Sequence, residues 1–103
     1  MYKLCFYVPI DHLERVKEAI FKAGAGKQGN YECVCWQTSG EGQFKPLPGS
    51  NPYIGEIGKV HQLREFKVET ICEELAVKNV IDALIRSHPY EKPAYEFWPI
   101  ESY

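Results

Sequence analysis

Two halves of this chain carry the same pattern of apolar residues, and this repeat constrains the fold more than any other feature. Shifting the first half by 64 positions superimposes apolar residues at helical spacing: Leu13 on Val77, Val16 on Val80, Ala19 on Ala83 and Ile20 on Leu84. Residues three and four apart form one stripe along a helix, and such a stripe is buried against a core. The repeat therefore predicts two similar halves, each built around one amphipathic helix.

Segments rich in aromatic and β-branched residues flank both helical stripes. They predict strands at residues 2–9, 31–38, 62–72 and 94–98. The order of elements is then β-α-β-β-α-β, which is the ferredoxin-like α/β plait. Its two βαβ halves form one antiparallel sheet with both helices on one face. The predicted fold class is α+β, and residues 1–103 are expected to form a single domain.

Polar residues and glycines mark the expected ends of the helices. Asp11 is predicted to cap the first helix, and Glu14 stands three residues on, as in a capping box. Gly24 is expected to end that helix. The second helix is predicted to begin after Glu74 and to stop at His88, which precedes a proline.

The composition argues against two classes of partner. The 103 residues carry a formal net charge of −2 and have a pI of about 5.9, so no basic excess attracts nucleic acid. No apolar run approaches the length of a membrane span, so no membrane partner is expected. The first residues have the pattern of a strand leading into a helix and lack that of a signal peptide. The expected location is the cytoplasm.

The four cysteines, Cys5, Cys33, Cys35 and Cys72, are expected to be reduced, because no secretory signal is visible. Cys33 and Cys35 lie two residues apart in a predicted strand, which places both thiols on one face. That geometry suits neighbouring thiols better than an unstrained disulfide. All four are predicted to be structural thiols.

The sheet face without helices is expected to be covered by another subunit. A face in contact with water should carry polar residues at alternate positions. The first strand instead has Cys5 and Tyr7 opposite its core side, and the last strand has Ala94 and Trp98 there. Both faces therefore look apolar, and this chain has no third layer to cover the second one.

No pattern of an enzyme is visible. Residues 24–29 match G-x-G-x-x-G, but they follow a helix and precede a strand, the reverse of a dinucleotide-binding turn. A glycine-rich helix exit explains them better. His12 and His61 have no metal-ligand spacing to other histidines or to a cysteine pair, and they are expected to be solvated on the surface. Because no nucleophile–base pair or metal constellation appears, the chain is predicted not to be an enzyme.

Residues 40–59 form a long segment rich in glycine and proline. Loops of this length are uncommon in a small domain unless they are functional or disordered. Apolar residues of the buried type within the segment argue against disorder: Phe44, Leu47, Tyr53, Ile54 and Ile57. We expect an ordered excursion that reaches a neighbouring subunit or a ligand, or that covers the domain's own core. The candidate ligand-binding residues are Phe44, Lys45, Asn51 and Gly55, together with Tyr90.

The densest polar cluster is the stretch from His88 to Pro93. In one interpretation it is structural: His88 sits at a helix C-terminus, where positive charge is favourable, and the prolines stop the helix and open an edge strand. In the other, His88 and Glu91 bind a divalent cation, and Tyr90 stacks on a ligand. No cofactor is certain, and a divalent metal ion is the one candidate.

Three stretches carry a resemblance to a known family: Gly24-Ala25-Gly26 with Gly29-Asn30-Tyr31, the glycine- and proline-marked run from Gly42 to Gly55, and His88-Pro89-Tyr90-Glu91-x-Pro93-Ala94-Tyr95. The chain resembles the inserted domain of the NIF-three-like family, also called YqfO. The resemblance covers essentially the whole chain, and the last stretch is also similar to one in CutA-type proteins. Lys92 stands where the family usually has an acidic residue.

The resemblance implies the fold of PII signalling proteins and CutA, which are trimeric. It also implies that the two-metal site of the family belongs to a flanking main domain, which these 103 residues do not include. A hydrolase or cyclohydrolase activity is therefore not expected of them.

The sequence thus predicts a non-enzymatic regulatory domain that forms a homotrimer. It is expected to bind a small molecule or a metal ion at subunit clefts lined by residues 40–59 and 88–93. The alternative is a structural module for protein–protein interaction or oligomerisation that binds no small ligand.

Overall fold

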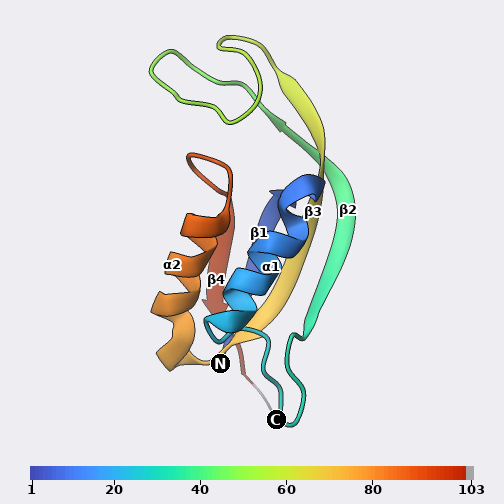
Figure 1. Cartoon of the computed structure of the whole chain (residues 1–103), viewed down its shortest axis with the longest axis vertical. Helices are drawn as coiled ribbons and strands as arrows, with labels where there is room; N and C mark the ends of the chain where they lie inside the picture. The colour runs from blue at the N-terminus through green and yellow to red at the C-terminus, as the bar shows by residue number, and fades with distance from the viewer. Residues whose placement is uncertain (102–103) are drawn as a thin grey trace.

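The computed structural model, which describes residues 1–101, is a four-stranded antiparallel sheet with two helices on one face (Figure 1). The strand order across the sheet is β2-β3-β1-β4. This order places the two central strands of the plait, β3 and β1, between two edge strands. It confirms the predicted α+β ferredoxin-like fold.

The elements follow one another in the predicted order. They are β1 (Tyr2–Pro9), a 3-10 turn η1 (Ile10–His12), α1 (Leu13–Lys22), β2 (Cys35–Phe44), β3 (His61–Cys72), a second 3-10 turn η2 (Glu74–Ala76), α2 (Val77–Ser87) and β4 (Tyr95–Pro99). Among the described residues, no helix has the length and apolar character needed to cross a membrane.

The core lies between the sheet and the two helices. Alternate residues of β1 point into it, and Leu4, Phe6 and Val8 are completely buried. The repeated helical stripe supplies the other side of the core through Leu13, Val16, Ile20, Val80 and Leu84. Burying a side chain of this size contributes about 1.5–3 kcal/mol. The sequence repeat therefore corresponds to the part of the molecule that holds the fold together.

The start of α1 differs from the prediction. Asp11 lies inside η1, and the residue before α1 is His12, which makes no side-chain capping bond. The capping box with Glu14 was a wrong prediction. After Pro9 the chain makes one 3-10 turn, in which the backbone N–H of Leu13 bonds to the carbonyl of Ile10. A backbone hydrogen bond thus takes the place of the capping bond that was expected from the Asp11 carboxylate.

The second strand lies further along the chain than predicted. Cys33 has a φ of 59°, which takes it out of extended geometry, and β2 begins only at Cys35. The two thiols therefore do not share a strand face, and that prediction is wrong. All four cysteines are free: Cys5 and Cys72 are buried, Cys35 is half-buried and Cys33 is exposed.

The helix-free face of the sheet is mixed in character and not apolar throughout. Strand alternation and the β1–β3 register place Cys5, Tyr7, Lys67 and Glu69 on this face. Cys5 is buried there, but it is paired in register with a carboxylate on each neighbouring strand. The prediction of a second apolar face is thus wrong for β3 and for Glu96 of β4.

Strands β2 and β3 extend beyond the rest of the sheet as a two-stranded arm (Figure 1). Pairing of β1 with β3 ends at Pro9 and Glu65, whereas pairing of β2 with β3 continues to Phe44 and His61. A loop of residues 45–60 joins the two strands at the tip. The excursion expected over residues 40–59 is thus a strand end followed by this tip loop.

Candidate ligand cavity

A cavity of about 770 Å³ opens on the helix-free face, where the arm leaves the sheet. Its floor is formed by residues 38–44 of β2 and by the alternate residues 65, 67 and 69 of β3. Its walls come from the tip loop between residues 46 and 54, from Tyr7, and from the segment after α2. The two sequence segments singled out for their composition therefore line one cavity.

Tyr90 is fixed at the centre of the wall. Its hydroxyl donates a hydrogen bond of 2.8 Å to Oε2 of Glu65, and its backbone N–H donates to Nδ1 of His88 at 3.1 Å. Burial, followed by the bond to Glu65, raises the pKa of Tyr90 well above its usual range. The ring lies 6.1 Å from that of Phe44 and 6.3 Å from that of Tyr53, measured between centroids.

His88 is a buried residue at the end of α2, and its side chain joins this helix to β1 by a hydrogen bond. It is 6% exposed, and its Nε2 lies 2.7 Å from the carbonyl oxygen of Tyr7. Because Nδ1 accepts from the N–H of Tyr90, the proton of the neutral ring is on Nε2, which donates to Tyr7. Burial lowers the pKa of His88 despite that bond. The favourable positive charge expected at the helix end is therefore not its role.

The side chains of His88 and Glu91, which were predicted to bind a metal ion, are not arranged as metal ligands. Both ring nitrogens of His88 are hydrogen-bonded, and Oε2 of Glu91 accepts the backbone N–H of Asn51 at 2.9 Å. A metal ion could reach the imidazole only after one of its two bonds is broken. Within residues 1–101, no group of three or more His, Cys, Asp or Glu residues is arranged to hold a metal ion. The divalent cation stays a prediction.

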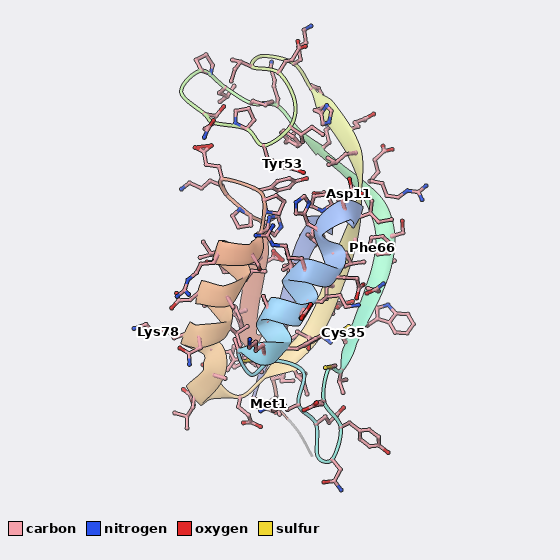
Figure 2. All side chains as sticks on the ribbon, in the orientation of Figure 1. Met1, Asp11, Cys35, Tyr53, Phe66 and Lys78 are labelled. Atoms are coloured by element: carbon pink, nitrogen blue, oxygen red, sulfur yellow. The ribbon has the colours of Figure 1, made fainter. Side chains whose placement is uncertain are left out.

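The tip loop is ordered by contacts with the body of the domain. The bond from Asn51 to Glu91 joins the loop to the segment after α2. Pro46 is buried, and its carbonyl accepts the N–H of Gly58 at 2.7 Å, which closes the base of the loop. Tyr53 lies between the loop and the body (Figure 2) and meets the ring of His12 edge-on, with 5.3 Å between centroids.

The structure brings most of the predicted ligand residues to this region. Phe44, Tyr90 and Glu91 line the cavity. Asn51 acts through its backbone as a loop anchor. Gly55 supports the wall from behind: its φ is 96°, and a Cβ there would lie 3.4 Å from both Phe44 and His61. Lys45 is exposed and does not line the cavity.

Sequence reasoning missed both histidine environments and the charged floor. His12 and His61 are half-buried, and each contacts an aromatic ring of this region, so the expectation of solvated surface histidines is wrong. Nδ1 of His12 is buried without a hydrogen-bond partner. The floor residues Glu65, Lys67 and Glu69 lie within the strand predicted at residues 62–72, and their spacing of two places them on one face.

The comparisons with known proteins give sequence relatives and structural neighbours. No family model matches the chain. It is 45% identical over 100 residues to a GTP cyclohydrolase 1 type 2 homolog of Halalkalibacterium halodurans, with 97% of this chain and 27% of that protein covered. The Bacillus subtilis protein of the same name is 43% identical, with 96% of this chain and 26% of that protein covered. The chain therefore spans about a quarter of the length of these relatives.

Solved structures agree with these matches. A Bacillus cereus protein related to NIF3 superposes with a TM-score of 0.83 at 34% identity, over 98% of this chain and 26% of that one. CutA of Archaeoglobus fulgidus gives a TM-score of 0.69 at 17% identity, over 99% of this chain and 86% of its own. The B. subtilis GlnK–ATP complex gives 0.61 at 11% identity, over 97% and 82%. The last two show a shared fold alone.

The sequence relatives and the NIF3-related structure are each matched over about a quarter of their length. Identities of 32–45% extend over nearly the whole of this chain. The chain is thus similar, over nearly its whole length, to a domain-sized part of NIF3-related proteins, and it has the fold of CutA and PII-like proteins.

Proposed function

We propose that this domain is a non-enzymatic regulatory domain that binds a small molecule in the cavity and assembles as a homotrimer. The observation that supports it is the cavity of about 770 Å³, which both unusual segments of the sequence line together. Pockets for small molecules typically have 300–1,000 Å³, with aromatic walls and a few placed polar groups. The fold and the relatives imply a small regulatory or interaction domain. The cavity is the site at which we propose that this domain binds its ligand.

Hydrogen bonds within the chain fix the walls of the cavity. The Tyr90–Glu65, His88–Tyr7 and Asn51–Glu91 hydrogen bonds each join a different pair of segments around it. Walls that are already fastened lose little conformational freedom when a ligand binds, so more of the contact energy appears as affinity. This arrangement favours binding of a ligand over a purely space-filling role for the loop.

The ionisable groups at the wall suit binding better than catalysis. The raised pKa of Tyr90 and the lowered pKa of His88 move both away from neutral pH, where general acids and bases work best. The polar atoms of both side chains are already in hydrogen bonds. The cyclohydrolase name belongs to relatives of which this chain spans about a quarter, and we propose no such activity for this segment.

The sheet's unpaired surfaces support the proposed trimer. β2 is an edge strand whose residues are mostly exposed, and Trp36 on the helix-free face is 69% exposed. Trp98 of β4, on the same face, is 41% exposed. Long exposed edges and large exposed aromatic residues mark surfaces that another chain can cover.

A thermal-shift screen of the whole chain against a metabolite library tests the ligand proposal. A ligand that binds only the native state raises Tm by mass action. At a ligand concentration about one hundred times Kd, the free energy of unfolding increases by about 2.7 kcal/mol. Tyr53→Ala removes a half-exposed ring from the cavity wall, so it should lose the response. Tyr31→Ala removes a ring that is 75% exposed outside the cavity, so it should keep the response. Equal responses of both variants would refute the site.

The same exposed residues favour a second candidate, a module that binds protein partners and no small molecule. Tyr31 and Trp36 are among its most exposed aromatic residues and lie outside the cavity. This candidate predicts no hit in the screen and a change in assembly or partner binding for Trp36→Ala. The cytoplasmic location remains an expectation beside both candidates.

A further inference from the structure

The lining of the cavity is rich in carboxylates. Three carboxylates, of Glu65, Glu69 and Glu91, stand against the ammonium groups of Lys67 and Lys92; Glu41 also borders the cavity, but strand alternation places its side chain on the other face of β2. The two ion pairs found within residues 1–101 join other residues, one on α1 and one in the tip loop. The lining, as far as the structure describes the chain, includes no arginine. Arginine is the side chain best suited to hold a phosphate or carboxylate with two parallel hydrogen bonds.

The floor places these charges in a fixed row. Glu65, Lys67 and Glu69 occupy alternate positions of β3, so their side chains stand on the same face, about 7 Å apart along the strand. Lys67 is therefore flanked by a carboxylate on each side, and its charge is offset before any ligand arrives. An anionic ligand would have to approach this lysine past two negative groups.

One of these carboxylates is positioned by its surroundings. Glu65 accepts the hydroxyl of Tyr90 at 2.8 Å. Its side chain also packs directly over Gly42 of the neighbouring strand, where even a Cβ atom would collide with it. A glycine on β2 and a tyrosine after α2 thus hold one acidic group in the cavity. Oε2 accepts this hydrogen bond, and Oε1, which has no hydrogen-bond partner within residues 1–101, retains accepting capacity.

Aromatic rings supply the other half of the lining. Tyr7, Phe44, Tyr53 and Tyr90 all border the cavity. The face of an aromatic ring attracts a cation within about 6 Å, and the attraction increases as the cation loses water. Rings beside carboxylates form a site in which both components favour positive charge.

Resting on the function proposed above, we propose that the ligand of this cavity is a small organic cation, with its ammonium group between the aromatic rings and the carboxylates of β3. This chemistry is the opposite of that of a nucleoside triphosphate, which carries several negative charges. The shared fold with a GlnK–ATP complex therefore does not extend to the ligand class. The carboxylates and aromatic rings that line the cavity favour a cationic ligand over an anionic one.

A matched pair of probes tests the charge. Choline and 3,3-dimethyl-1-butanol have nearly the same shape, but the first carries a quaternary nitrogen where the second has a carbon. The binding of each, and of AMP as an anionic probe, is measured on the whole chain by amide chemical-shift titration. We expect choline to shift amides around Tyr7, Tyr53 and Tyr90 and to bind at least fivefold more tightly than the neutral analogue. The affinity should fall as salt rises.

Three variants locate the effect. Glu69→Gln keeps the shape of a floor residue and removes its charge, so choline should bind about three- to tenfold more weakly. Glu18→Gln makes the same change at an exposed position of α1 outside the cavity, so the affinity should not change. Tyr53→Leu removes a wall ring and should also weaken binding. The spectra of each variant show directly whether it remains folded.

The outcomes separate this inference from the proposed function. Equal or tighter binding of the neutral analogue or of AMP at the same amides overturns the cation preference and leaves the cavity as a ligand site. Equal weakening by Glu69→Gln and Glu18→Gln also overturns it, because the attraction would then belong to the whole protein. Absence of binding by all three probes overturns the cation inference. A library screen that also finds no ligand then overturns the proposed function as well.

Discussion

Replacing His88 by leucine tests whether this residue is a buried tie or only a helix end. The variant keeps much of the side-chain volume and removes both hydrogen bonds, to the carbonyl of Tyr7 and from the N–H of Tyr90. A net hydrogen bond contributes about 0.5–1.5 kcal/mol, and an unsatisfied buried backbone group costs about 1–3 kcal/mol. The free energy of unfolding should therefore fall by about 2–4 kcal/mol.

The measurement is urea denaturation followed by circular dichroism at a fixed protein concentration, because assembly would make the midpoint depend on concentration. Arg86→Ala is the matched control: Arg86 is an exposed basic residue in the last turn of α2, where only the helix dipole term applies. It should cost at most about 0.5 kcal/mol. A loss of less than about 1 kcal/mol for His88→Leu, equal to that of the control, would refute the tie.

Four further outcomes are expected. Burial lowers the pKa of His88 in the folded chain, so as pH falls below about 6.5 only the unfolded chain takes up a proton on this imidazole. The free energy of unfolding should therefore drop by up to about 1.4 kcal/mol per pH unit in that range. The drop should be smaller in His88→Gln. Gly42→Ala should cost about 1–3 kcal/mol by displacing Glu65, while Gly40→Ala, which has open space, should cost under about 0.5 kcal/mol in the same denaturation series. A reducing agent should leave Tm unchanged, because all four cysteines are free thiols, and a large decrease would contradict this. Light scattering should give about three times the chain mass of 11.9 kDa, and a stable monomer would contradict the trimer.

The fold could be predicted because its signal is repeated. The same helical stripe occurs twice, and every core residue of α1 and α2 that is fully buried belongs to it: Val16, Ile20, Val80 and Leu84. A burial pattern that appears at the same spacing in two places is hard to produce by chance. The first strand is predicted separately, from the aromatic and β-branched residues at positions 2–9, and β1 has these bounds.

The position of β2 could not be predicted from the residues of that strand alone. Gly40 and Gly42 were taken as loop residues, since glycine weakens strands. In the structure both are extended and paired with β3, and at Gly42 the missing side chain makes room for Glu65. The requirement arises on another strand, twenty-three residues along the chain, and no local pattern contains it. The strand's late start has a similar origin, in the positive φ of Cys33.

The candidate site was half predictable. Phe44 and Tyr90, which were predicted to bind a ligand, and Glu91, which was predicted to bind a metal ion, all line the cavity, and they lie in segments whose composition is unusual for a small domain. The charged floor was missed because alternating charges in a strand are normally a solvated face. Only the tip loop, folded back over the arm, turns that face into a cavity floor, and the fold-back depends on contacts such as Asn51 with Glu91.

β3 shows how one strand can serve stability and binding separately. Its residues Val68 and Cys72 face the helices and are buried in the core, whereas Lys67 and Glu69 face the cavity. Because the side-chain period of a strand is two, a substitution at one set leaves the other on its own face. Substitutions can therefore change the charge of the cavity floor while the core contacts that hold the sheet remain in place. Glu65 is the exception, since its carboxylate is also part of the packing between Gly42 and Tyr90. For that reason Glu69, and not Glu65, is the position at which charge can be tested with the least structural disturbance.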